Sequence, residues 1–295
     1  MLSLLVPGGS GQLGRALAGL ASPEAEVRAP GSAELDLTET SAVVAAVSDL
    51  AERARAAGRR PVVINAAAYT AVDAAETDEW RAFAVNADGP RVLAAACSSR
   101  RVPLVHVSTD YVFSGEHDRP YEPEDALRPR SAYGRTKAAG EDAVLGSGAR
   151  SWIVRTSWVY GAGGSNFVHT IERLAAERAT LSVVDDQRGS PTWAADLAAG
   201  LLELASRIAE GTGPGRRVLH CAGAGETTWY GFARAIFEEI GADPDRIRPC
   251  TTDEFPRPAP RPAYSVLSNA SWRDAGLTPL RPWRDALHAY LSSTR

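Results

Sequence analysis

The chain of 295 residues has little sulfur, with three cysteines and one methionine. Cys97, Cys221 and Cys250 are odd in number and far apart, so they match neither a disulfide framework nor the ligand spacing of a zinc site. We expect buried, unreactive thiols, as in proteins of the reducing cytoplasm. The sequence also lacks any apolar run of the ~18 to 20 residues that a membrane crossing requires.

An excess of positive charge is missing as well. The net charge is −4 at pH 7, which argues against nucleic acid as the main partner. The apolar start, Met1–Val6, has only the length of a strand and runs directly into glycines, so we expect no signal peptide. At about 150 residues per domain, the length predicts one or two domains.

The first half of the chain alternates short apolar runs with longer amphipathic ones. The runs typical of buried strands are Leu2–Val6, Val62–Asn65, Val102–Ser108 and Trp152–Thr156, with a weaker one at Glu26–Ala29. The helical patterns between them are Gln12–Ala21, Thr38–Ala57, Glu76–Arg100 and Ala132–Leu145. This alternation predicts an α/β fold, a Rossmann-type doubly wound sheet of parallel strands covered on both faces.

The alternation becomes irregular after Trp158. Helical patterns continue at Phe167–Arg178, Trp193–Ile208, Thr228–Ile240 and Trp283–Leu291, with short strands at Leu181–Val184 and Arg217–Cys221. The proline-rich segment Pro256–Pro262 cannot be helical, and we expect an extended segment that either faces a ligand or links surface elements. We therefore expect a dinucleotide-binding domain over residues 1–160 and a smaller C-terminal α/β domain over residues 161–295, part of which returns to the first.

A glycine loop joins the first strand to the first helix. Gly8, Gly11 and Gly14 stand where a tight turn must let the backbone approach a pyrophosphate closely. The helix N-terminus then offers free N–H groups to the negative charge. Many glycine-rich turns bind nothing, but the position at the first βα junction favours a dinucleotide site.

The region after the second strand normally separates NAD from NADP binding. Arg28, Ser32 and Glu34 lie near the expected place, and none of them decides between the two cofactors. The pair Asp36–Leu37 is placed to lie near the adenine. Asp36 could equally cap the helix expected from Thr38, and both roles are compatible.

Two further strands end in small or hydroxyl side chains. Ala66, Ala67 and Ala68 follow the third strand, where small residues let a cofactor lie flat; a tightly packed turn is the alternative. Ser108 and Thr109 end the fourth, where a hydroxyl can stabilise a developing alkoxide. A simple hydrogen bond at the strand end is the alternative for that pair.

Tyr133 and Lys137 lie one helical turn apart and project from the same helix face. A phenol has an ordinary pKa near ~10, and a nearby cation favours its ionised form, which would make it usable in acid–base catalysis. The alternative without a catalytic role is a tyrosine that lies beside a surface lysine. The glycine loop and the hydroxyl strand, occurring in this order, favour a reductase. Asp185–Asp186 and Glu238–Glu239 are interpreted as solvated charge, so we expect no metal site.

These residues resemble the extended short-chain dehydrogenase/reductase superfamily and, within it, the dTDP-4-dehydrorhamnose reductase family. The strings that carry the resemblance are Val63–Glu76, Ser108–Phe113, Tyr133–Glu141, Arg155–Gly161, Val184–Thr192, Thr227–Trp229 and Arg261–Asn269. The glycine loop is common to the whole superfamily, whereas the later strings are much narrower.

The resemblance implies a role for each matching residue. Tyr133 would donate a proton to the C4 oxygen of a keto sugar, Lys137 would lower its pKa and hold the nicotinamide ribose, and Thr109 would bond the same oxygen. The cofactor, NADPH or NADH, would be lined by Gly8, Gly11, Gln12, Leu13, Gly14, Asp36, Leu37, Ala66, Ala67, Ala68, Tyr133 and Lys137. The substrate would meet Thr109, Asp110 and Trp158, with Asn166, Arg188 and Arg261 as further candidates.

The implied reaction is reduction of the C4 ketone of dTDP-4-dehydro-6-deoxy-L-mannose to dTDP-L-rhamnose in the cytoplasm, by a monomer or homodimer with no nucleic-acid or membrane partner. Some members hold Mg²⁺ through a glutamate after the glycine loop; Gly14-Arg15-Ala16 has no carboxylate there, so that metal is not expected. Two alternatives stay open. One is a 4-ketoreductase for an antibiotic sugar, and the other is a non-catalytic nucleotide-binding subunit.

Overall fold

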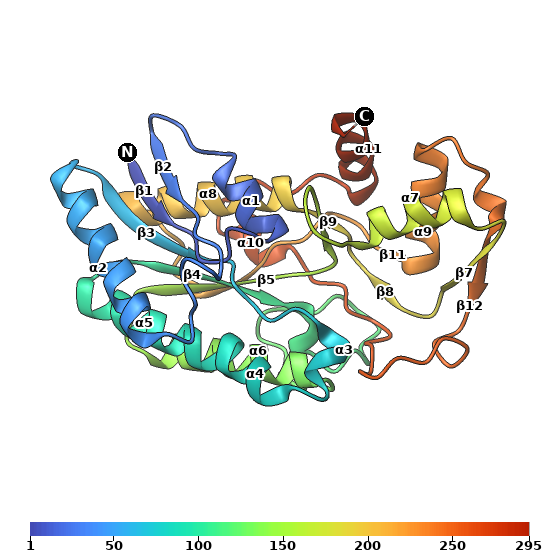
Figure 1. Cartoon of the computed structure of the whole chain (residues 1–295), viewed down its shortest axis with the longest axis horizontal. Coiled ribbons are helices and arrows are strands. Elements are labelled where there is room, and N and C mark those ends of the chain that lie inside the picture. The colour runs from blue at the N-terminus through green and yellow to red at the C-terminus, as the bar shows by residue number, and fades with distance from the viewer. Residues whose placement is uncertain (295) are drawn as a thin grey trace.

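A sheet of six parallel strands forms the centre of the fold (Figure 1). In the computed structural model, which describes residues 1–294, its order is β10-β5-β4-β3-β1-β2. The strands are β1 (Leu2–Leu5), β2 (Ala25–Arg28), β3 (Arg60–Asn65), β4 (Leu104–Thr109), β5 (Ser151–Thr156) and β10 (Val218–His220). The order runs outward from β1 in both directions, which confirms the predicted Rossmann-type α/β class.

Helices cover both faces of this sheet. One face carries α2 (Thr40–Ala56), α5 (Gly89–Arg100) and α6 (Ala132–Gly146). The other carries α1 (Gln12–Ala18), α8 (Ala194–Glu210) and α10 (Ala270–Asp274). Burial on both sides explains why the strands are almost continuously apolar. Three elements beyond residue 160 thus belong to this sheet: β10 is one of its strands, and α8 and α10 cover one of its faces. The domain boundary itself stays a prediction.

The helix predicted over Glu76–Arg100 is observed from Glu79 to Arg100, with a π-helical turn inside it. The segment forms α4 (Glu79–Phe83), a π-helical turn (Ala84–Asp88) and then α5, preceded by the short helix α3 (Val72–Ala75). Pro90 lies in the first turn of α5 and lacks the N–H group that a continuous helix would need there. The buried side chain of Asn86 holds the turn by bonding both backbone groups of Tyr69, at 2.8 and 3.1 Å.

The C-terminal part packs three helices around short strand pairs (Figure 1). The helices are α7 (Phe167–Glu177), α9 (Trp229–Glu239) and α11 (Trp283–Ser293). The paired strands are β6 (Val159–Tyr160) with β9 (Thr192–Trp193), β7 (Leu181–Val184) with β12 (Ile247–Cys250), and β8 (Arg188–Gly189) with β11 (Thr227–Thr228). The short 3₁₀ turns are η2 (Asp110–Val112) and η3 (Pro244–Arg246).

The proline-rich segment is neither helix nor strand, and it lies against α3. Arg257 and Arg261 both pair with Asp73, at 3.1 and 2.8 Å, and the side chain of Ala259 is buried. Of the two expected roles, this arrangement favours a surface link between the C-terminal part and α3.

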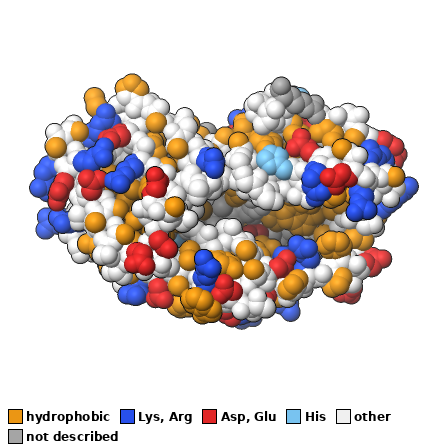
Figure 2. All heavy atoms as spheres, viewed as in Figure 1, with side chains coloured by type: hydrophobic (Ala, Val, Ile, Leu, Met, Phe, Trp, Pro, Cys, Tyr) orange, Lys and Arg blue, Asp and Glu red, His pale blue; other side chains and the backbone are white. Residues whose placement is uncertain are grey.

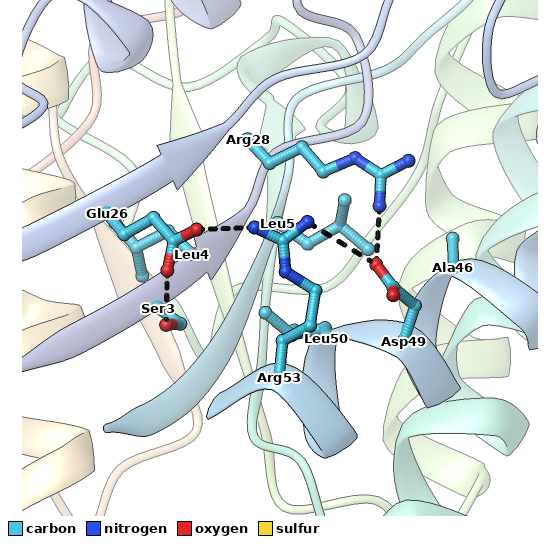
Figure 3. Close-up of a pocket in the computed structure, with 9 residues that line it drawn as sticks. All are labelled: Ser3, Leu4, Leu5, Glu26, Arg28, Ala46, Asp49, Leu50 and Arg53. Carbon is cyan, nitrogen blue, oxygen red and sulfur yellow. Dashed lines mark hydrogen bonds and ion pairs between the residues drawn. The ribbon is translucent and has the colours of Figure 1, made fainter. Parts of the chain in front are cut away.

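A small hollow of about 20 Å³ lies between β1, β2 and α2 (Figure 3). Arg28 bonds Asp49 at 2.7 Å and Arg53 bonds Glu26 at 2.8 Å across it. The hollow has room for about one water molecule, and such exposed ion pairs typically contribute about 0–1 kcal/mol each. We therefore assign it a minor role in joining α2 to the edge strand. Within residues 1–294, no helix combines the length and apolar character of a membrane span.

Candidate active site

A cavity of about 1250 Å³ runs along the carboxyl ends of the parallel strands. It corresponds to the hollow that separates the two parts of the molecule in Figure 2. Open α/β sheets bind ligands at this edge. The residues singled out from the sequence that line the cavity are Gly8, Gly11, Gln12, Leu13, Gly14, Asp36, Leu37, Ala66, Ala67, Ala68, Thr109, Asp110, Tyr133, Lys137 and Trp158.

The glycine loop lies directly against the neighbouring strand ends. Gly8 has a φ of +92°, and a Cβ atom there would lie 2.6 Å from the backbone nitrogen of Ala67. A Cβ on Gly14 would lie 2.2 Å from the oxygen of Gly8. Gly11 begins α1 without a side-chain cap, so the first N–H groups of α1 are left for a ligand. The loop can therefore hold a phosphate group.

Asp36 also lines the cavity. Its Oδ1 atom accepts hydrogen bonds from the backbone N–H of Thr38 at 2.9 Å and from the Thr38 hydroxyl at 2.8 Å. Helix α2 begins only at Thr40, so Asp36 shapes the turn before the helix rather than capping it. Arg28 does not line the cavity, because its guanidinium is paired with Asp49.

Three buried polar atoms in the cavity wall lack a hydrogen-bond partner among the described residues. They are Ser108 Oγ and Asp110 Oδ2, at the end of β4, and Thr156 Oγ1, at the end of β5. Buried polar groups in folded proteins are nearly always paired, and exceptions mark functional sites. These three atoms therefore indicate a place where a polar ligand binds.

Asp110 carries the largest electrostatic cost of the three. Its side chain is buried, and burial raises the pKa of Asp110 from 3.8 to about 6. The folded state binds this proton more tightly than the unfolded state, so Asp110 destabilises the fold increasingly as pH rises from about 4 to about 6.

We predict that Asp110→Asn raises the free energy of unfolding by about 2 kcal/mol at neutral pH, because an amide carries no charge to desolvate. Below about pH 4 the gain should vanish, since the carboxyl group is then neutral in both states. Urea unfolding at both pH values checks this. An equal gain at both pH values would show that the effect is not one of ionisation.

Helix α6 presents Tyr133 from its first turn, next to the end of β4. The helix is capped by Ser131, whose Oγ accepts from the N–H of Gly134 at 3.1 Å. Burial raises the pKa of Tyr133 to about 12, and a hydrogen bond with Thr109 offsets only part of this rise. Lys137 is not among the causes of this shift, and the effect predicted for Lys137 on Tyr133 stays a prediction. The phenol stays protonated at neutral pH, as a proton donor must.

Lys137 is fully enclosed by the sheet and α6. Its Nζ donates to the carbonyl oxygen of Val107 at 2.8 Å and lies 3.4 Å from Nε2 of His106. Burial lowers the pKa of Lys137 to about 8, while the charge of Glu141 opposes that change. Burial and the charge of Lys137 also keep the pKa of His106 well below its usual range, so the imidazole is neutral. Lys137 thus points along β4 toward the cavity rather than into solvent.

Trp158 follows β5 in a strained conformation. Its φ of +46° lies in the left-handed region, which costs a bulky residue roughly 1–3 kcal/mol. The indole stacks on Trp229, at the start of α9, with ring centroids 3.5 Å apart and an interplanar angle of 5°. Both rings line the cavity. No sequence motif predicts a separate role for Trp229; only its place in the string Thr227–Trp229 pointed to it.

Comparison with known proteins decides the family. The model of the RmlD substrate binding domain matches residues 2–295. The chain belongs to this family. It is 49% identical to a dTDP-4-dehydrorhamnose reductase of Mycobacterium tuberculosis, over 98% of this chain and 92% of that protein.

Two further relatives agree with this. A Streptomyces antibioticus protein named as a probable dTDP-4,6-dihydroxy-2-methyloxan-3-one 4-ketoreductase is 48% identical, over 96% of this chain and 92% of that protein. The crystal structure of dTDP-4-dehydrorhamnose reductase from Bacillus anthracis in complex with NADP superimposes with a TM-score of 0.90 at 33% identity, covering 99% of both chains.

Three residues expected at the site of this RmlD-family protein do not line the cavity. Asn166 caps α7, and its amide nitrogen donates to the oxygens of Gln12 and Gly161 at 3.1 and 2.9 Å. Arg188 pairs with Glu226 at 3.1 Å, and Arg261 pairs with Asp73. The roles predicted for these three side chains stay predictions.

Among residues 1–294, no group of three or more histidine, cysteine or acidic side chains is placed to hold an ion. Asp185 instead accepts a hydrogen bond from Thr228, and Asp186 accepts two from Thr252. These interactions give the acidic pair a structural role.

Proposed function

We propose that the protein reduces the C4 ketone of dTDP-4-dehydro-6-deoxy-L-mannose to dTDP-L-rhamnose, with NADPH or NADH as reductant. The observation that carries the proposal is that Thr109, Tyr133 and Lys137 line the same cavity as the glycine loop. The names of relatives that are nearly half identical over almost the whole chain support the same substrate class.

The cavity residues that come from the glycine loop and the ends of the first strands fit a nicotinamide dinucleotide. The glycine loop and the open N-terminus of α1 hold the pyrophosphate, and Asp36 faces the adenosine end. The alanines Ala66–Ala68 present only methyl groups, which leave room for a flat ring system. When bound, this cofactor supplies the hydride for the reaction.

The chain's own residues bind the C4 carbonyl oxygen and donate the proton that it receives. Thr109 and Tyr133 both hydrogen-bond the C4 carbonyl oxygen and so stabilise the negative charge that develops as hydride adds to C4. The C=O π electrons become a lone pair on oxygen, and Tyr133 Oη transfers its proton there to complete the alcohol. A phenol with a raised pKa keeps that proton until an alkoxide, a much stronger base, is present. The Lys137 ammonium group donates one hydrogen to the carbonyl oxygen of Val107. Its other hydrogens would hold the nicotinamide ribose.

The Streptomyces antibioticus relative favours a second candidate of the same chemistry, a 4-ketoreductase for a more deoxygenated antibiotic sugar. The two candidates differ in hydroxyl groups on the sugar ring. Rates on dTDP-4-dehydrorhamnose and on its 2,6-dideoxy counterpart, with the product configuration at C4, separate them.

The test of the proposal is oxidation of NADPH or NADH by the purified protein on mixing with the keto sugar. We place the protein in the cytoplasm and choose cytoplasmic assay conditions. We expect the absorbance of the reduced cofactor to fall in step with dTDP-rhamnose formation. A cofactor that binds tightly but is never consumed by either sugar would instead indicate a non-catalytic binding subunit. The same sample, measured by light scattering, distinguishes a monomer from a homodimer.

A further inference from the structure

Among the 32 lysine and arginine residues of the chain, Lys137 is the only lysine. An arginine guanidinium keeps its charge in proteins, whereas a buried lysine can lose its proton near neutral pH. The one side chain of this kind lines the cavity, one helical turn after Tyr133 on α6. The groups around Lys137 Nζ therefore decide how readily the site gives up this proton.

The hydrogen bonds of Asn65 fix the tautomer of His106. These two buried residues pair across β3 and β4. Asn65 Oδ1 accepts from the backbone N–H of Ala67 at 3.1 Å, so the amide nitrogen of Asn65 is the atom that faces His106 Nδ1, at 3.0 Å. An amide nitrogen only donates, so Nδ1 accepts. Because the buried imidazole is neutral, its one hydrogen lies on Nε2.

This Nε2–H group faces Lys137 Nζ at 3.4 Å, and Nζ also donates to the carbonyl oxygen of Val107 at 2.8 Å. An ammonium group carries only donors, so it cannot accept the hydrogen of Nε2. An uncharged amine can accept it with its lone pair, while its own hydrogens serve the Val107 oxygen and a ligand in the cavity. The surroundings of Nζ thus offer every partner that the amine needs, and they oppose the ammonium.

The charge of Glu141, one turn further along α6, acts in the other direction. Its attraction for the ammonium is limited, because Arg155 of β5 bonds both carboxylate oxygens of Glu141, at 2.9 and 2.7 Å. Burial has the larger effect and lowers the pKa of Lys137 to about 8, whereas the pKa of Tyr133 is about 12. Lys137 is therefore the first of the two to lose its proton as pH rises.

We propose that His106 is a positioning residue, which aims its Nε2–H group at Lys137 Nζ and thereby favours the uncharged amine. The inference rests on the proposed function and deepens it. The Lys137 ammonium stabilises the phenolate that Tyr133 becomes when it gives its proton to the sugar, so activity falls at alkaline pH once Lys137 loses its charge. His106 sets the pH at which this fall begins.

His106→Gln tests this in the full-length protein. Glutamine reaches as far as the Nε2 atom of histidine, but it can turn its oxygen toward Nζ and accept from the ammonium. Because the chain has one lysine, lysine labelled with carbon-13 at Cε gives a single NMR signal, and its midpoint on pH titration is the pKa of Lys137. We expect a midpoint at about 8 in the wild type. In His106→Gln it should lie about one pH unit higher, the scale of one hydrogen bond to a charged group.

The pH dependence of kcat for NADPH oxidation with the keto sugar gives the second readout. Its alkaline limb should move upward by the same amount in His106→Gln, whereas a purely structural defect would lower the rate at every pH. His106→Asn keeps an acceptor for the Asn65 amide but no longer reaches Lys137, so it should raise the midpoint by less than His106→Gln does.

The tautomer itself can be observed in the wild type. Nitrogen-15 NMR of the histidine side chains shows which ring nitrogen carries the hydrogen, with His106 assigned by its absence from the spectrum of either variant. We expect the hydrogen on Nε2. His169→Asn is the matched control, because His169 bonds Tyr290 Oη at 2.6 Å in the C-terminal part and does not line the cavity. It should move neither the Lys137 midpoint nor the alkaline limb. NADPH titration confirms that each variant is folded.

The outcomes are distinct. A hydrogen on Nδ1 in the wild type, or a Lys137 midpoint that is unchanged or lower in His106→Gln, overturns the role of His106. A midpoint that rises while the alkaline limb stays in place overturns its effect on the reaction. If the wild type oxidises no cofactor with any dTDP-keto sugar, the proposed function fails, although the NMR titration still decides the effect of His106 on Lys137.

Discussion

Tyr133→Phe is expected to lower kcat by roughly 10²–10⁴-fold, the usual contribution of a positioned acid–base group. The substitution removes only the hydroxyl that gives its proton to the new alkoxide. The ring remains, so its edge contact with Tyr111, at 5.5 Å between centroids, is preserved. Cofactor affinity should therefore stay within about twofold. Steady-state oxidation of NADPH with the keto sugar, and NADPH titration of the same sample, measure the two quantities.

A matched control for this result is Tyr160→Phe. The Tyr160 hydroxyl is also buried, but it has no partner among the described residues and does not line the cavity. Its removal should leave kcat unchanged within about twofold. A Tyr133→Phe enzyme with wild-type turnover would eliminate Tyr133 as the proton donor, and a rate equally lowered in both variants would indicate a general effect of losing a phenol.

Arg155→Met is expected to lower the free energy of unfolding by about 3–5 kcal/mol, the typical cost of breaking a buried ion pair. Arg155 on β5 bonds both carboxylate oxygens of Glu141 on α6, at 2.9 and 2.7 Å, and its side chain is only 3% exposed. It also donates to the oxygen of Pro123 at 3.1 Å. Removing the guanidinium leaves the Glu141 carboxylate buried and unpaired. Urea denaturation gives the value.

Two further variants test this explanation. In Glu141→Leu/Arg155→Met both charges are gone, so this double variant should be more stable than Arg155→Met alone. Arg216→Met breaks an exposed pair with Glu124, whose side chains are 46% and 65% exposed, and should change stability by less than about 1 kcal/mol. A double variant no more stable than Arg155→Met would show that lost packing, and not the unpaired charge, causes the defect.

The sequence predicted local features well where a short range of residues determines them. The helix predicted over Thr38–Ala57 is observed over Thr40–Ala56, and the strand Leu181–Val184 has the predicted bounds. The prediction for Glu76–Arg100 missed the π turn inside the helix, because amphipathic periodicity continues through such a turn. Only the contacts of Asn86 with a distant loop reveal that turn.

By itself, the amino-acid sequence determined the fold class and the order in which the glycine loop, Thr109 and Tyr133 occur, because periodicity, glycine positions and motif spacing are properties of neighbouring residues. Only the tertiary structure decided the environment of each group. Burial by distant elements raises the pKa of Tyr133, directs Arg261 to Asp73, and brings Trp229 onto Trp158. Desolvation and ring stacking depend on which residues meet in space, and no local pattern contains that information.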